Sequence, residues 1–132
     1  DRPDLALVVG GDGVHLGADD LPVPSVKNKW PDLTVGATQR VEDPPEQTAD
    51  YLGLGPVFES GTKSVGHEPS GWEEVAGFIE KTDQPVYAIG GITPERCEGI
   101  PDDLSGVCVI GSVWNRKNPV EGLRELRERL PE

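Results

Sequence analysis

Five short apolar stretches recur along the chain, and each of them ends in glycine. Most are apolar at consecutive positions rather than at every second position, which is typical of parallel strands covered by helices on one face and by a packed core on the other. We therefore predict five parallel strands. They occupy residues 13–17, 33–36, 51–55, 86–90 and 106–111.

The segments between these stretches carry helix signals. Apolar residues at i, i+3, i+4 and i+7 predict a helix at 72–79, and Asn118 followed by Pro119 predicts the capped start of another. The residues expected to share one side of each helix are Trp72, Val75, Ala76 and Ile79 in the first, and Val120, Leu123, Leu126 and Leu130 in the second.

Shorter helices are expected elsewhere. Residues 3–9 predict one that Gly10 and Gly11 close, and Thr93 with Pro94 predicts a helix start after the fourth strand. Proline-marked segments at 22–30 and 43–49 are further candidates.

Strands and helices therefore alternate, and the 132 residues correspond to a single α/β domain, 1–132. Such units build either a doubly wound open sheet or part of a (β/α)8 barrel of the TIM type. Polar or glycine residues follow every strand instead of gathering at one crevice, which favours the barrel. They are Asp19, Asp20, Thr38, Ser60, Thr62, Lys63, Gly90, Gly91, Gly111 and Ser112.

Glycines at the ends of the last two strands indicate a phosphate site. They expose backbone N–H groups, and the helices that follow add positive dipole ends. The same glycines also suit ordinary tight turns, and residues alone do not separate the two interpretations.

Other candidate residues also have two interpretations. Asp19 and Asp20 suit Mg²⁺, which favours one or two carboxylates with water and substrate oxygens, but they also suit a turn or a helix cap. Lys63 is a candidate anion ligand or a solvated loop lysine. His15 lies in an otherwise apolar stretch, and we expect it to be buried and hydrogen-bonded. A functional role for this histidine is the alternative.

Charge and cysteine content narrow the class of protein. A formal net charge of −12 argues against binding to nucleic acid or to an anionic membrane surface, and no apolar run is long enough to span a bilayer. Cys97 and Cys108 match neither a disulfide framework nor a zinc motif, so we expect a reducing, cytoplasmic setting. The sequence contains no methionine, and we expect a processed, truncated or engineered piece.

Four motifs in order resemble the thiamine-phosphate synthase family. They cover nearly the whole chain, and their order and spacing make the resemblance specific. The motifs are residues 12–17 (DGVHLG) followed by 20–22 (DLP), residues 50–58 (DYLGLGPVF) with Thr62 and Lys63, and residues 88–92 (AIGGI).

The resemblance implies a transferase that condenses hydroxymethylpyrimidine diphosphate with thiazole phosphate, giving thiamine phosphate and pyrophosphate. Asp1 and Asp20 would bind Mg²⁺ and, through it, the pyrophosphate. Lys63 would contact both phosphorylated substrates and steady the departing pyrophosphate. The Thr38 hydroxyl would contact the pyrophosphate, and Ser60 and Thr62 stand at the family's two threonine positions beside Lys63. The thiazole phosphate would be bound by backbone N–H groups of Gly91, Ile110 and Gly111.

The chain also departs from the family pattern. It would begin just before the fourth strand of the barrel and lack the first three, and Gly111 stands where a serine is usual. An incomplete barrel exposes two sheet edges and part of its core, so we expect either the missing strands from another segment or a homo-oligomer.

Three interpretations remain open. One is a synthase whose other strands lie elsewhere, and another is a non-catalytic phosphate-binding half-barrel that oligomerises. The third is a relative of the thiazole tautomerase, which resembles this fold but uses a histidine where this chain has Arg40. Lys63 together with Arg40 favours the synthase.

Overall fold

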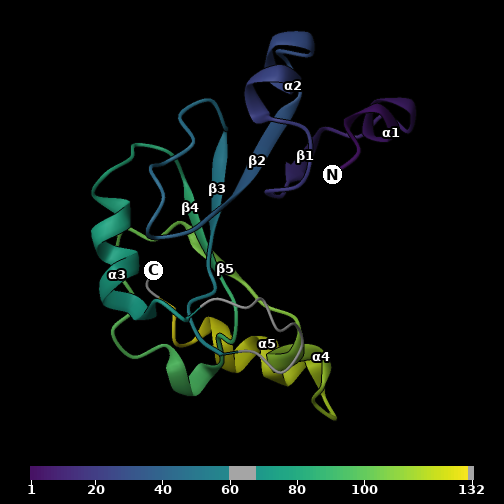
Figure 1. Ribbon diagram of the computed structural model, residues 1–132. Helices are drawn as coiled ribbons and strands as arrows, with labels where there is room; N and C mark the ends of the chain where they lie inside the picture. The colour runs from purple at the N-terminus through teal and green to yellow at the C-terminus, as the bar shows by residue number, and fades with distance from the viewer. Residues whose placement is uncertain (60–67, 131–132) are drawn as a thin grey trace.

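The computed structural model of the chain describes residues 1–59 and 68–130. Its centre is a single five-stranded sheet in which neighbours along the chain are neighbours in the sheet and every pair is parallel (Figure 1). This confirms the prediction of five parallel strands. The strands are β1 (Gly13–Leu16), β2 (Thr34–Gln39), β3 (Tyr51–Leu54), β4 (Val86–Ile89) and β5 (Gly106–Cys108).

Helices separate the strands along the chain. In Figure 1, α1 and α2 lie near β1 and β2, whereas α4 and α5 lie together at the opposite end of the structure. They are α1 (Pro3–Val8), α2 (Val23–Lys29), α3 (Gly71–Ile79), the 3-10 helix η1 (Pro94–Arg96), α4 (Gly111–Trp114) and α5 (Pro119–Arg127). None of the helices in the described ranges is both long enough and apolar enough to cross a membrane.

One face of the sheet forms the core with the helices. Val35, Leu52 and Val86, on three neighbouring strands, are at most 1 % exposed. From the helical side, Val75 and Phe78 of α3 belong to the same buried cluster. Removing apolar surface from water contributes about 25 cal/mol per Å², so this layer is the main stabilising contact of the fold.

The other face of the sheet, here called the inner face, is more polar. His15, Thr38 and Cys108 are exposed on it, and Tyr51 and Tyr87 are half-buried. The register aligns them because every second residue of a strand points to the same side. The inner face is therefore not covered by a packed core within the described residues, contrary to the expectation from the apolar stretches.

Several helix predictions need correction. Residues 43–49 form turns rather than a helix, because Pro44 and Pro45 lack backbone N–H groups and disfavour helical geometry in the residue before each of them. Thr93 and Pro94 begin only one 3-10 turn, η1, without a side-chain cap.

Asn118 caps α5 as predicted, since its side chain accepts a hydrogen bond from the Glu121 N–H. The predicted apolar side is only partly buried, however: Leu126 is 2 % exposed, whereas Val120 is 67 % and Leu123 is 55 % exposed. Their periodicity marks one side of a helix, but no described element covers that part of it.

An ion pair fastens α2 to the sheet. Lys27 Nζ lies 2.9 Å from Asp50 Oδ2 and also donates to the carbonyl oxygens of Pro31 and Leu33. Asp50 Oδ2 accepts a further hydrogen bond from the Val35 N–H at 2.7 Å. Burial opposes ionisation of Asp50, but the hydrogen bonds from Val35 and Lys27 outweigh it and lower its pKa.

We predict that Lys27→Met lowers the free energy of unfolding by about 1–2 kcal/mol, because it removes the charge-assisted hydrogen bonds around Asp50. Urea denaturation at pH 7 measures this, and Lys81→Met, at an exposed lysine, should change stability by less than about 0.5 kcal/mol. Since the folded-state pKa of Asp50 is lowered, its contribution is present above the unfolded pKa and is lost as the pH falls through the lower, folded-state pKa. Equal stability of the two variants would contradict the role of Lys27.

Candidate functional site

The carboxyl ends of the five parallel strands share one edge of the sheet, here called the carboxyl edge. Of the described site residues, Asp1 and Asp20 lie by the end of β1, Gly91 follows β4, and Ile110 and Gly111 follow β5. The predicted position of Thr38 after the second strand needs a small correction, because Thr38 lies inside β2. Ser60, Thr62 and Lys63 lie outside the described residues.

Backbone hydrogen bonds bring the two aspartates to the end of the same strand. The nitrogen of Asp1 donates to the His15 carbonyl oxygen at 2.7 Å, and the Gly17 N–H donates to Asp20 Oδ2 at 2.7 Å. Asp20 thus closes a turn, which was one of the two interpretations of this residue. Its other carboxylate oxygen has no protein donor among the described residues.

The carboxylate ligands at the end of β1 suit a hard cation only in part. No group of three or more histidine, cysteine or acidic side chains that could hold a metal occurs in the described ranges. Two exposed carboxylates at one strand end nevertheless match Mg²⁺, which keeps several waters and takes substrate phosphate oxygens as further ligands. Asp1 and Asp20 therefore fit Mg²⁺ bound together with a phosphorylated substrate, but not a site made of protein ligands alone.

A hydrogen-bonded cluster lies on the inner face below this edge. His15 Nε2 lies 3.0 Å from Thr38 Oγ1, and His15 Nδ1 lies 3.2 Å from the Tyr51 hydroxyl. Space for these rings comes from two glycines: a Cβ at Gly36 would overlap the Tyr51 ring, and one at Gly53 would lie 2.9 Å from His15 Cε1.

His15 differs from its predicted state. It is hydrogen-bonded as expected, but the residue as a whole is exposed rather than buried. Partial burial of its ring lowers its pKa, and the charge of Asp20 opposes this shift. The motif gave no separate signal for Tyr51 as its partner, because this contact depends on the pairing of β1, β2 and β3.

The turn after β4 requires glycine at two successive positions. Gly90 and Gly91 have φ angles of 106° and 60°, which favour glycine. A Cβ at Gly91 would lie 2.7 Å from the Phe58 carbonyl oxygen, so there is also no room for a side chain. Neither N–H group of this glycine pair has an acceptor among the described residues.

Unbonded donors also occur after β5. Within the described ranges, the N–H groups of Gly111 and Ser112, at the start of α4, find no acceptor. The buried Ser112 hydroxyl has no partner there either. Two neighbouring strand ends thus present backbone donors at the carboxyl edge, an arrangement that suits a phosphate group.

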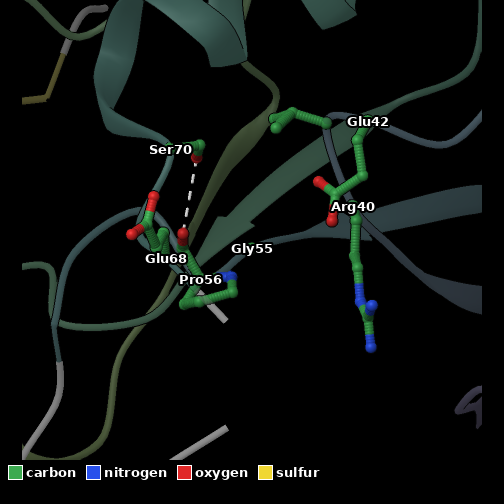
Figure 2. Close-up of a pocket in the computed structure, with 7 residues that line it drawn as sticks. Arg40, Glu42, Gly55, Pro56, Glu68 and Ser70 are labelled. Atoms are coloured by element: carbon green, nitrogen blue, oxygen red, sulfur yellow. Dashed lines mark hydrogen bonds between the residues drawn. The ribbon is translucent and has the colours of Figure 1, made fainter. Parts of the chain in front are cut away.

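A small pocket lies between the loops that follow β2 and β3 (Figure 2). Arg40 and Glu42 form one side of it, and Glu68 and Ser70 form the other, where the Ser70 hydroxyl donates to the Pro56 carbonyl oxygen at 3.4 Å. The guanidinium group of Arg40 points away from the other labelled side chains. Arg40 is the position at which the resemblance implies a histidine in the tautomerase, and no imidazole is present there.

Parallel βα units with donors gathered at their carboxyl edge define an α/β protein of the (β/α)8 barrel type. Thiamine phosphate pyrophosphorylase from Pyrococcus furiosus matches this structure with a TM-score of 0.81 and 34 % sequence identity, over 98 % of this chain and 64 % of that one. This likeness confirms the fold class.

The sequence comparisons are more specific. The family model described as thiamine monophosphate synthase matches residues 1–113, and the chain belongs to that family. Thiamine-phosphate synthase from Archaeoglobus fulgidus is 37 % identical over 131 residues, which cover 97 % of this chain and 62 % of that protein. The corresponding protein from Anaeromyxobacter dehalogenans is 45 % identical over 117 residues, covering 85 % of this chain and 50 % of that protein. The chain therefore spans less than two thirds of the length of these relatives.

We predict that Gly91→Ala destabilises the protein by about 1–3 kcal/mol, because alanine is strained at positive φ and its Cβ would meet the Phe58 carbonyl oxygen. The matched control is Gly77→Ala in α3, where a Cβ meets nothing within 4 Å and where helix propensity favours alanine. Thermal melts compare the two variants. A Gly91→Ala protein as stable as Gly77→Ala would show that the turn does not need glycine.

Proposed function

We propose that residues 1–132 form a single domain that supplies strands four to eight of a thiamine-phosphate synthase barrel. The observation that carries this proposal is the row of backbone donors after β4 and β5 that find no acceptor among the described residues, at the same edge as Asp1 and Asp20. In the proposed reaction, the thiazole nitrogen attacks the methylene carbon of hydroxymethylpyrimidine diphosphate. The bond from that carbon to the diphosphate oxygen breaks, giving thiamine phosphate and pyrophosphate.

The thiazole phosphate is assigned to the ends of β4 and β5. Backbone N–H groups of Gly91, Ile110 and Gly111 would bind its oxygens, and the Ser112 N–H, which has no acceptor in the part of the chain that the structure describes, supports the same placement. Main-chain donors and a short helix start bind an anion locally even in a chain with a net charge of −12. This contact would position the nucleophile without acting on the bond that breaks.

The pyrophosphate is assigned to the other half of the edge. Asp1 and Asp20 would hold Mg²⁺, which would supply positive charge to the leaving group. Lys63, with Ser60 and Thr62, would donate to the pyrophosphate oxygens. The Thr38 hydroxyl would do the same, and its hydrogen bond to His15 Nε2 would restrict its orientation.

The remaining strands would come from another segment or from a second copy of the chain. More than a third of the A. fulgidus relative lies outside the match. Exposed apolar residues on two elements support such a contact, with Val8 of α1 82 % exposed and Val120 of α5 67 % exposed. We also assign the protein to the cytoplasm, which its two free cysteines support.

A non-catalytic, oligomeric phosphate-binding half-barrel is the second candidate, and the uncovered inner face favours it over an active monomer. Light scattering of the chain distinguishes assembled from monomeric protein, and an assay for thiamine phosphate distinguishes an active assembly from an inactive one. A tautomerase-like activity has less support, because Arg40 replaces its histidine.

We predict that Asp20→Asn weakens pyrophosphate binding in the presence of Mg²⁺ at least about tenfold, because it removes a metal ligand's charge but keeps an oxygen that can accept from the Gly17 N–H. Titration calorimetry with and without Mg²⁺ measures the change. The control is Asp19→Asn, an exposed neighbour that makes no described hydrogen bond. If Asp20→Asn binds as tightly as the wild type, Asp20 is a turn residue only.

We predict that Lys63→Ala reduces thiamine phosphate formation by the complete enzyme at least about a hundredfold, because the leaving group loses a positive charge in the transition state. Its melting temperature should stay within experimental error of the wild type. Lys81→Ala serves as the charge-matched control. Normal turnover by Lys63→Ala would remove this lysine from the mechanism, and a wild-type enzyme that forms no thiamine phosphate would refute the proposed function.

A further inference from the structure

Two consecutive carbonyl groups at the end of β4 accept hydrogen bonds from one neighbouring segment. The Val57 N–H donates to the Ile89 carbonyl oxygen and the Phe58 N–H donates to the Gly90 carbonyl oxygen, both at 3.0 Å. These donors belong to the main chain, so no side-chain substitution removes them. They orient the first half of the glycine turn.

The third carbonyl in this row depends on a side chain instead. Arg96 Nη1 donates to the Gly91 carbonyl oxygen at 2.9 Å, and the same nitrogen lies 3.2 Å from the Glu59 carbonyl oxygen. Arg96 therefore joins the end of the turn to the segment after β3. Because a peptide unit is planar, holding the Gly91 carbonyl fixes the direction of the Ile92 N–H group, which finds no acceptor among the described residues.

Contacts on both ends of Arg96 hold it in place. Its guanidinium carbon lies 5.3 Å from the centre of the Phe58 ring, a distance typical of a cation–π contact. Its own carbonyl oxygen accepts a hydrogen bond from Trp72 Nε1 at 2.6 Å. The Trp72 and Phe58 rings pack edge to face, with centres 5.4 Å apart, so α3 supports the arginine at both contacts.

We propose that Arg96 is a positioning residue for the phosphate of the thiazole substrate. It anchors the Gly91 carbonyl group, and this anchor fixes the Ile92 N–H group as a further donor beside those of Gly90 and Gly91, whose directions are set by the main-chain hydrogen bonds of Val57 and Phe58. The inference rests on the proposed function, since it takes the turn as the thiazole phosphate site. Arg96 touches neither substrate; it acts through Gly91.

A lysine does not replace Arg96 fully. A guanidinium group is planar, donates in several fixed directions and stacks on an aromatic ring, whereas an ammonium group is a compact and strongly hydrated charge. The Arg96→Lys variant would retain the charge and one carbonyl contact but lose most of the stacking on Phe58. This variant therefore separates an effect of positive charge from an effect of geometry.

The test compares Arg96→Ala, Arg96→Lys and Arg124→Ala in the full-length enzyme. Arg124 is an exposed α5 arginine that makes no described ion pair. We expect Arg96→Ala to raise the KM for thiazole phosphate at least about tenfold. The kcat and the KM for the pyrimidine diphosphate should stay within about twofold, Arg96→Lys should recover part of the loss, and Arg124→Ala should match the wild type.

An unchanged KM for thiazole phosphate, or an equal rise in both KM values, would overturn the proposal. If Arg96→Ala does not fold, Arg96→Lys decides the question by the same criteria. An inactive wild type would refute the proposed function, and the role of Arg96 in holding a phosphate is then tested separately by titrating inorganic phosphate while the amide signals of Gly91 and Ile92 are followed by NMR. Wild-type signals that shift with phosphate, and Arg96→Lys signals that shift only at about tenfold higher phosphate, would support it. Identical titration curves for the two proteins, or wild-type amide signals that do not shift with phosphate, would contradict it.

Discussion

The parallel register of the five strands is the constraint on which the other features depend. In a parallel sheet every strand ends at the same edge, so residues that are far apart in the sequence meet there. Asp20 and Gly91 share this edge although more than 70 positions separate them along the chain. The buried layer formed by Val35, Leu52 and Val86 maintains the register, since a slip by one residue would bring apolar side chains to the inner face.

The two faces of the sheet contribute differently to the protein. The face that packs against the helices stabilises the fold by apolar burial, whereas the inner face carries His15, Thr38 and Tyr51 in one hydrogen-bonded cluster. Glycines at 36 and 53 make this cluster fit, because side chains there would overlap the aromatic rings. Removing either glycine would therefore disturb the site without touching a charged residue. At the carboxyl edge, the glycine turn after β4 likewise leaves no room for a side chain and exposes backbone N–H groups, which are the basis of the proposed anion site.

Much of this architecture could be predicted from local patterns. All five strands, α3 and the Asn118 cap of α5 follow from apolar runs, helical spacing and cap chemistry, which act over a few residues. Residues 43–49 do not form the predicted helix, because two consecutive prolines disfavour helical geometry there. Val120 and Leu123 show that periodicity gives the apolar side of a helix but not whether anything covers it. The contacts of Arg96 with Gly91 and of His15 with Tyr51 depend on how the strands and loops pack, so no local pattern could predict them.

A crystal structure of the full-length protein bound to thiamine phosphate, Mg²⁺ and pyrophosphate would test the proposed site at the carboxyl edge. We expect the product's phosphate on the N–H groups that follow β4 and β5, and the metal ion between Asp1, Asp20 and the pyrophosphate. Both ligands bound at the opposite, amino-terminal edge of the strands, or a phosphate that contacts neither glycine turn, would contradict it.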